Sequence, residues 1–162
     1  MENKPIQDFY EDLASVCYGC GRLNEHGLHV QTYWNGEEGV ATFQPQPYHL
    51  AMPGYVYGGL LASLVDCHSI GTAAAAVYEA EQRPPGSDPV LRYVTGSLHV
   101  DYLKPTPVDQ TLTLRARAVE MRPGGRKVRV ECSIYAGEVE TVRGQVVAVL
   151  MPESWIARLR DQ

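Results

Sequence analysis

An almost unbroken apolar stretch from Leu60 to Ala80 constrains the fold of this chain more than any other part of the sequence. Small or apolar residues would occupy nearly every side of the helix that this stretch forms, so the helix needs protein around its whole circumference. A run of about 20 apolar residues also fits a membrane span, but Asp66 and His68 lie near its centre, where such groups are costly. The stretch therefore predicts a buried central helix rather than a membrane helix.

Strands are predicted on both sides of this helix. After it, alternating apolar and polar residues predict strands over 93–103, 111–121, 128–136 and 139–150. In the first of these, strict alternation places Thr95 on the face opposite Val94 and Leu98. Before the helix, Asn35-Gly36 predicts a hairpin between 28–34 and 40–44. A short helix is expected over 5–16, with a small cap around Trp155. One curved sheet wrapped around the helix would bury both the helix and the apolar face of the strands.

Length and charge limit the classes of protein that this chain can represent. Its 162 residues fit one domain spanning 1–162, with a core large enough to fold alone. The net charge of −5 argues against a general nucleic-acid binder, and no DNA-binding helix-turn-helix is evident. The first residues carry no secretory signal pattern, and four cysteines are too few for a disulfide framework. We therefore expect a cytoplasmic protein.

A CxxC pair stands near the N-terminus, as Cys17 and Cys20. Two ligands do not close a tetrahedral zinc site, so a tight glycine-containing turn with two packed thiols is the favoured interpretation. A metal site that also uses His26 and His29 is the alternative. We expect no bound metal and no other cofactor.

Two features of the central stretch could carry chemistry. Gly58-Gly59 at its start either permits a tight turn or leaves backbone N–H groups free to hold a polarised carbonyl oxygen. Asp66 is a lone acid on an apolar helix, which is costly to bury unless it is paired or used. His68 is two positions further on and faces away from Asp66, so a packed, hydrogen-bonded histidine is favoured over a catalytic one.

These residues resemble a known family. Tyr57-Gly58-Gly59 and the acid at Asp66 resemble the His-Gly-Gly motif and following acid of the hotdog-fold acyl-CoA thioesterases, especially the phenylacetyl-CoA-type (PaaI-like) branch. The segments 95–105, ending in Lys-Pro, and 17–28 are also similar to that branch. The resemblance implies an α+β hotdog fold, in which a curved antiparallel sheet wraps around one long helix and pairs with a second copy.

The resemblance also implies roles for single residues. Asp66 would act as general base or nucleophile, the Gly59 amide would polarise the thioester carbonyl, and Thr95 would position the attacking water. Tyr57 stands where the family usually has His, a departure that leaves the backbone N–H of Gly59 unaffected. Tyr57, Gly58 and Ser63 are expected to contact the substrate.

A basic cluster bears on coenzyme A. Six of the fourteen basic residues lie within 115–129, with only Glu120 opposing them in that segment. Either they form a solvated strand face, or some of them, Arg126 and Lys127 first, recognise the phosphates of coenzyme A. The six residues are Arg115, Arg117, Arg122, Arg126, Lys127 and Arg129.

The sequence is thus interpreted as an acyl-CoA thioesterase that forms a homodimer or a homotetramer with sites at the dimer interface. A non-catalytic acyl-CoA binding or sensing domain is the alternative from another class. A hotdog hydratase or dehydratase is disfavoured by Tyr57, because it would be expected to use a His together with an acid.

Overall fold

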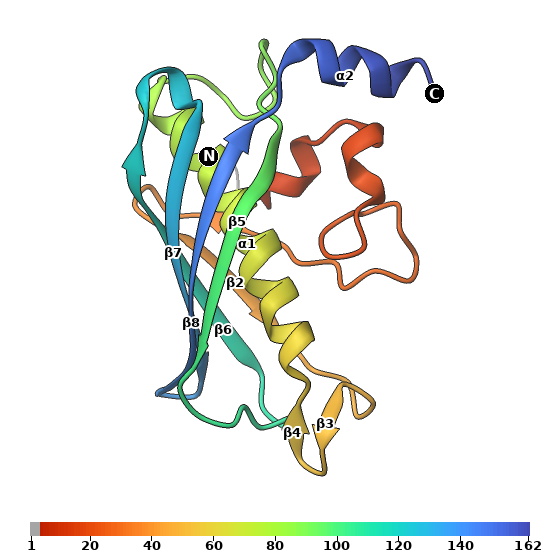
Figure 1. The fold of residues 1–162 in the computed structure, drawn as a ribbon, viewed down its shortest axis with the longest axis vertical. Helices are drawn as coiled ribbons and strands as arrows, with labels where there is room; N and C mark the ends of the chain where they lie inside the picture. The colour runs from red at the N-terminus through yellow and green to blue at the C-terminus, as the bar shows by residue number, and fades with distance from the viewer. Residues whose placement is uncertain (1–3) are drawn as a thin grey trace.

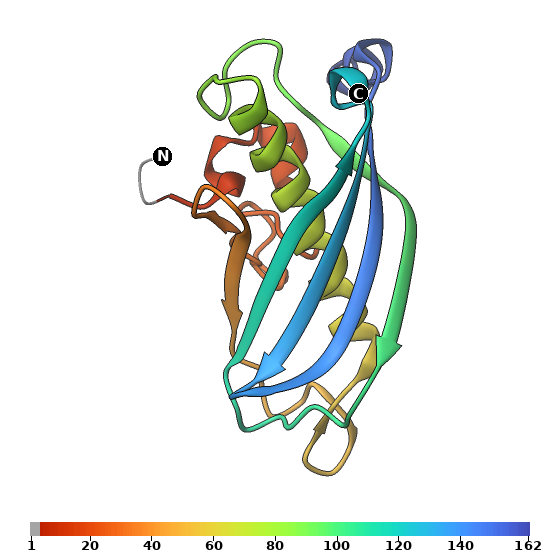
Figure 2. The ribbon, with the colours of Figure 1, turned by 90° about the vertical axis from the view of Figure 1, so that its left-hand side faces the viewer.

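The long helix α1, Gly58–Ala80, lies against one face of a six-stranded antiparallel sheet in the computed structural model, which describes residues 4–162 (Figure 1, Figure 2). The strand order is β1-β2-β6-β7-β8-β5. These strands are β1 (Tyr33–Trp34), β2 (Gly39–Phe43), β5 (Tyr93–Tyr102), β6 (Leu112–Met121), β7 (Lys127–Ala136) and β8 (Val139–Leu150). This is the predicted sheet wrapped around a central helix.

The helix forms the centre of the core because apolar side chains on the inner face of the sheet alternate with outward-facing polar ones. Leu64 and Val65 on α1 are fully buried, as are Val130 and Val146 on the sheet. The helix packs closely on β8, since a Cβ at Gly144 would lie 2.4 Å from a methyl group of Val65. In the most apolar 18-residue window of α1, 78% of the residues are buried inside the protein, as expected of a core helix.

The four strands after the helix begin and end within one residue of their predicted bounds. The first hairpin also forms, but its first strand is only Tyr33–Trp34, shorter than the predicted 28–34. A second small hairpin, β3 (Leu50–Met52) and β4 (Tyr55–Val56), precedes α1.

The N-terminal segment differs from its prediction. Instead of one helix over 5–16 it forms two short 3-10 helices, η1 (Ile6–Phe9) and η2 (Asp12–Val16), separated by extended backbone at Tyr10 and Glu11. Tertiary hydrogen bonds explain the difference, because the backbone N–H of Ile6 donates to Thr32 O at 2.8 Å. The segment covers the side of α1 that the sheet leaves open (Figure 1).

The predicted C-terminal cap is α2, Glu153–Arg160, which lies beside the N-terminal segment (Figure 1). Arg160 Nη2 contacts Glu11 Oε1 at 2.9 Å. The two ends of the chain thereby form one wall beside the middle of α1. A 3-10 turn, η3 (Pro123–Gly125), joins β6 to β7.

Candidate active site

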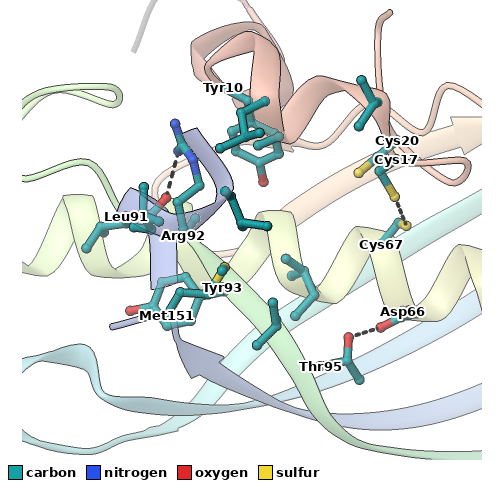
Figure 3. Close-up of a pocket in the computed structure, with 18 residues that line it drawn as sticks. Tyr10, Cys17, Cys20, Asp66, Cys67, Leu91, Arg92, Tyr93, Thr95 and Met151 are labelled. Atoms are coloured by element: carbon teal, nitrogen blue, oxygen red, sulfur yellow. Dashed lines mark hydrogen bonds between the residues drawn. The ribbon is translucent and has the colours of Figure 1, made fainter. Parts of the chain in front are cut away.

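Asp66 and Thr95 form a hydrogen-bonded pair between α1 and β5. The Thr95 hydroxyl donates to Asp66 Oδ1, and Figure 3 shows the two side chains pointing toward each other. The resemblance had named both residues, and the structure brings them into contact across 29 positions of sequence.

A β-bulge makes this contact possible. The register of β5 against β8 shifts between Thr95 and Ser97, so that Thr95 pairs with the buried Ala148 and Leu98 with the buried Val146. Thr95 and Leu98 therefore share the face that looks toward the helix, and the prediction from strict alternation was wrong at Thr95. Gly96 fits the bulge because a Cβ there would lie 2.7 Å from a methyl group of Val149.

Burial controls the acidity of Asp66. The carboxyl is partly buried, and desolvation raises its pKa because the charged form loses hydration. The hydrogen bond from Thr95 lowers the pKa and offsets part of this effect, while negative charge on the nearby Cys17 raises it. The result is a carboxylate that is more basic than an exposed one and held in one orientation.

This pair borders an apolar cavity of about 370 Å³. Its walls come from the N-terminal segment, the middle of α1, the start of β5 and α2 (Figure 3). The lining residues are Tyr10, Leu13, Ala14, Val16, Cys17, Cys20, Asp66, Cys67, Ile70, Ala74, Leu91, Arg92, Tyr93, Val94, Thr95, Met151, Ile156 and Leu159. Asp66 and Arg92 are the charged side chains of this lining, which suits a hydrophobic ligand beside a polar reacting end.

Three polar residues of this cavity were not found from the sequence. Tyr10 and Tyr93 both have a pKa raised chiefly by burial, so their hydroxyls stay neutral. The guanidinium of Arg92 lies 5.7 Å from the centre of the Tyr10 ring, and its Nη2 is 3.3 Å from Glu11 Oε2. The apolar spacing in segment 5–16 had predicted a short helix, but nothing in it indicated that this segment lines a cavity.

The glycine turn lies away from this cavity within one chain. Gly58 and Gly59 begin α1, and the N-cap residue Tyr57 makes no side-chain capping hydrogen bond. Their carbonyl oxygens accept hydrogen bonds from Tyr102 and Ser63, at 2.8 and 2.9 Å, whereas the first N–H groups of a helix have no partner inside it. The Tyr57 ring folds back over Gly59, where a Cβ would lie 2.3 Å from the Tyr57 hydroxyl oxygen.

None of these four expected contact residues, Tyr57, Gly58, Gly59 and Ser63, is among the residues that line the Asp66 cavity. Asp66 lies seven positions after Gly59, which is about 10 Å along a helix axis. One chain therefore does not bring the glycine amides to the acid.

His68 is structural, as the favoured interpretation had it. It is fully buried, with Nε2 donating to Gly39 O at 3.1 Å and Nδ1 accepting from the Thr32 hydroxyl at 2.9 Å. Burial lowers its pKa to about 4, so the imidazole is neutral at pH 7. It fixes α1 to the first hairpin and takes no part in the Asp66 cavity.

The CxxC pair has a third partner that sequence spacing did not reveal. Cys17, Cys20 and Cys67 place their sulfur atoms within 4.8 Å of one another, at the wall of the same cavity. Hydrogen bonds from Cys20 and Cys67 lower the pKa of the Cys17 thiol. The argument that only two thiols are present is therefore wrong. His26 is not part of the cluster, since its side chain is 84% exposed.

The basic cluster is less free than the sequence suggested. Arg115 and Arg117 both contact the carboxylate of Glu38, which comes from the first hairpin. Hydrogen bonding from Arg115 is the main cause that lowers the pKa of Glu38. Arg129 contacts Glu120 and Glu131, at 3.3 and 3.4 Å.

Arg126 and Lys127 are exposed, and their main chain lies close to the cavity. The backbone oxygen of Arg126 accepts from Leu150 N at 3.1 Å, and the neighbouring Gly125 O accepts from the Tyr93 hydroxyl at 2.7 Å. Tyr93 lines the cavity. These two cations therefore stand at the end of the sheet where the cavity begins.

Comparison with known proteins identifies the family. A family model described as the thioesterase superfamily matches residues 53–143, more than half of the chain. The chain therefore belongs to the thioesterase superfamily. Among solved structures, a thioesterase superfamily protein from Shewanella loihica PV-4 is 41% identical with a TM-score of 0.65, over 90% of this chain and 99% of that one.

More distant relatives are consistent with this assignment. Acyl-coenzyme A thioesterase THEM4 from Rattus norvegicus is 26% identical over 145 residues, which are 87% of this chain and 56% of that protein. THEM4 from Xenopus laevis is 28% identical over 112 residues, 69% of this chain and 44% of that protein. The chain thus spans about half the length of these curated relatives.

A likeness of fold alone links the chain to a structure containing coenzyme A. A hypothetical thioesterase from Streptococcus pneumoniae TIGR4, solved with coenzyme A, has a TM-score of 0.57 and 20% identity, over 71% of this chain and 82% of that one.

Proposed function

We propose that this protein is an acyl-CoA thioesterase, which hydrolyses a thioester to a free acid and coenzyme A. The observation that carries the proposal is the Asp66–Thr95 pair at the wall of an apolar cavity. Membership of the thioesterase superfamily supports it. So do the name of the THEM4 relatives and the coenzyme A in the Streptococcus pneumoniae structure.

The chemistry follows from the environment of Asp66. Its raised pKa makes the carboxylate a better proton acceptor than an exposed aspartate. As general base, it takes a proton from a water molecule whose oxygen attacks the carbonyl carbon. The carbon–sulfur bond then breaks, and the coenzyme A sulfur leaves and is protonated. As nucleophile, the carboxylate itself attacks the carbonyl carbon and the coenzyme A thiolate leaves and is protonated. Water then opens the resulting mixed anhydride, which releases the acid and restores the carboxylate.

Thr95 holds the carboxylate in either route. Because its hydroxyl donates to Asp66 Oδ1, it fixes the direction in which the other oxygen can act. In the general-base route this oxygen is the one that contacts water, so Thr95 positions the water through Asp66. The adjoining cavity accepts the acyl group, since most of its lining is apolar.

The site is completed by a second copy of the chain. Both the acid and the amide donors must reach the reacting group within about 3 Å, and one helix separates them by about 10 Å. The edge strand β5 supports pairing of copies, because it ends the sheet and exposes Val94, Leu98 and Tyr102, each by at least 40%. Pairing edge to edge would bring the Gly59 amide of one chain toward the Asp66 of its partner, in a dimer or in a tetramer built from such dimers.

Arg126 and Lys127 bind the phosphates of coenzyme A in this scheme. They stand near the cavity, whereas Arg115, Arg117 and Arg129 are already paired with carboxylates. A protein of net charge −5 needs such a local positive field to bind a polyanion.

The branch and the location are further parts of the proposal. The segments 17–28 and 95–105 favour the PaaI-like branch, and four cysteines without a disulfide fit the reducing cytoplasm. Cell fractionation with a tagged chain tests the location, and recovery outside the cytoplasmic fraction would contradict it.

A screen of coenzyme A thiol release tests the activity. Short, medium, branched and aromatic acyl-CoAs are supplied in large excess over the enzyme, so that its own cysteines add no signal. We expect at least one class to be turned over many times per chain, with kcat/KM of at least about 10⁴ M⁻¹s⁻¹. Tight binding of an acyl-CoA without turnover would instead indicate the binding or sensing alternative.

A further inference from the structure

Three cysteine side chains from two distant parts of the chain converge beside α1. Cys17 and Cys20 come from the segment after η2, and Cys67 comes from the middle of α1 (Figure 3). The Cys17 and Cys67 sulfur atoms are 3.9 Å apart, although 50 positions separate them in sequence. Within residues 4–162 this is the group of ligand atoms that meets the spacing of a metal site.

The spacing of the sulfur atoms matches thiolates around one ion. Zn–S bonds of about 2.3 Å at the tetrahedral angle place neighbouring sulfurs about 3.8 Å apart. The observed 3.9 Å for Cys17 and Cys67 lies close to that value. A disulfide needs sulfurs at about 2.05 Å, so these two would have to approach by nearly 2 Å to bond.

The backbone around the cluster is shaped to bring the CxxC turn onto the helix. A Cβ at Gly19 would lie only 2.2 Å from Cys67 Sγ, so a glycine at this position lets the turn approach. The turn itself closes through Gly21 N, which donates to Cys17 O at 2.8 Å. Val30 N donates to Gly19 O at 3.0 Å and holds the turn in place. The glycine at position 19 and these backbone hydrogen bonds are a second observation, separate from the sulfur distances, and both bring the thiols together.

We propose that Cys17, Cys20 and Cys67 bind one Zn²⁺ ion whose fourth coordination position opens toward the cavity beside Asp66. Thiolates are soft ligands that select such an ion, and three protein ligands leave one position of a tetrahedron for water. All three cysteines line the cavity, so that position is reachable from it. Binding releases the thiol protons to solvent.

The ion would fasten the N-terminal wall of the cavity to the helix that carries Asp66. It would add a direct link between the CxxC turn and Cys67 to the backbone hydrogen bonds that already hold the turn in place. Zn²⁺ binds the folded chain, so it should raise the melting temperature by on the order of 5 °C when present at 100 times its dissociation constant. This proposal does not depend on thioester hydrolysis.

Metal titration of the reduced, metal-free protein tests the proposal. Co²⁺ is the spectroscopic probe, because thiolate ligation gives an absorption band from sulfur-to-metal charge transfer. We expect the band to saturate at one Co²⁺ per chain and to disappear when one equivalent of Zn²⁺ is added. Zinc affinity is then measured by competition with a chromophoric chelator.

Variants separate the cluster from other thiols. Cys67→Ser should weaken Zn²⁺ binding by at least about 100-fold, since even partners that only hydrogen-bond to metal ligands cost 10-fold to 100-fold. Cys17→Ser, at an exposed position, should weaken Zn²⁺ binding in the same way. It replaces Cys67→Ser as the test if that variant folds poorly. Cys132→Ala is the matched control, because Cys132 is a free cysteine buried in the sheet outside the cluster, and it should keep full affinity.

Two results would overturn the proposal. One is a reduced wild-type protein that takes up no Co²⁺ or Zn²⁺. The other is unchanged affinity in both Cys67→Ser and Cys17→Ser, with circular dichroism showing that both are folded.

Discussion

Two inactive variants should restore each other's activity if the site spans two chains. The first is Asp66→Asn, which keeps the glycine turn but loses the base. The second is Gly59→Val, which keeps the acid but places bulk over the amide. At Gly59 the nearest atoms to an added Cβ belong to the Tyr57 ring, which is 57% exposed and can swing into solvent, so the second variant should fold.

The size of the recovery follows from counting sites. When the two chains are refolded together at equal concentration, half of the dimers are mixed, and each mixed dimer has one intact site of two. Activity should therefore return to about a quarter of the wild-type value, while each variant refolded alone stays inactive. Different tags on the two chains measure the mixed dimers directly. No recovery in a sample that contains mixed dimers would show that each chain carries its own complete site.

Three further predictions concern single parts of the account. Thr95→Val should lower kcat by on the order of 10-fold, because the hydroxyl orients the carboxylate, whereas Thr95→Ser should stay near normal. Equal rates in the wild type and both variants would show that the hydroxyl has no role in the site. Reversing the charges of Arg126 and Lys127 should raise KM more at low salt than at high salt, since exposed charges are screened, whereas an effect independent of salt would indicate packing. Glu38→Gln should destabilise the fold most near pH 7. Arg115 holds the pKa of Glu38 below its usual value of 4.5, so the contribution is present above that pH and is lost as pH falls through the lowered pKa. Denaturant unfolding of both proteins at several pH values measures it, and a constant difference down to pH 3 would contradict the assignment.

Local patterns were sufficient to predict the central helix and the long strands. The apolar run of α1 has no solvent-facing side, and β6 to β8 alternate over most of their length because one face meets the helix and the other meets solvent. Those patterns depend on neighbours in sequence. The N-terminal segment was mispredicted because its conformation depends on hydrogen bonds to Thr32, which no local pattern carries.

The site shows the same limit. Asp66 could be predicted because a lone acid in an apolar run is costly to bury unless it is paired or used. The face of the sheet on which Thr95 lies depends on a one-residue bulge, which strict alternation does not show. Cys67 looked like an ordinary apolar helix residue, and only folding brings it to the CxxC turn. Glu38 neutralises part of the basic cluster from a hairpin about 80 positions earlier in the chain.

The most direct test of the account is the turnover of Asp66→Asn with the best acyl-CoA from the screen. Asparagine keeps the shape of the side chain and cannot accept the proton or attack the carbonyl. The account predicts that kcat falls by at least roughly 100-fold while the melting temperature and circular dichroism stay close to wild type. Near-normal turnover by the folded variant would contradict the central claim that Asp66 performs the hydrolysis.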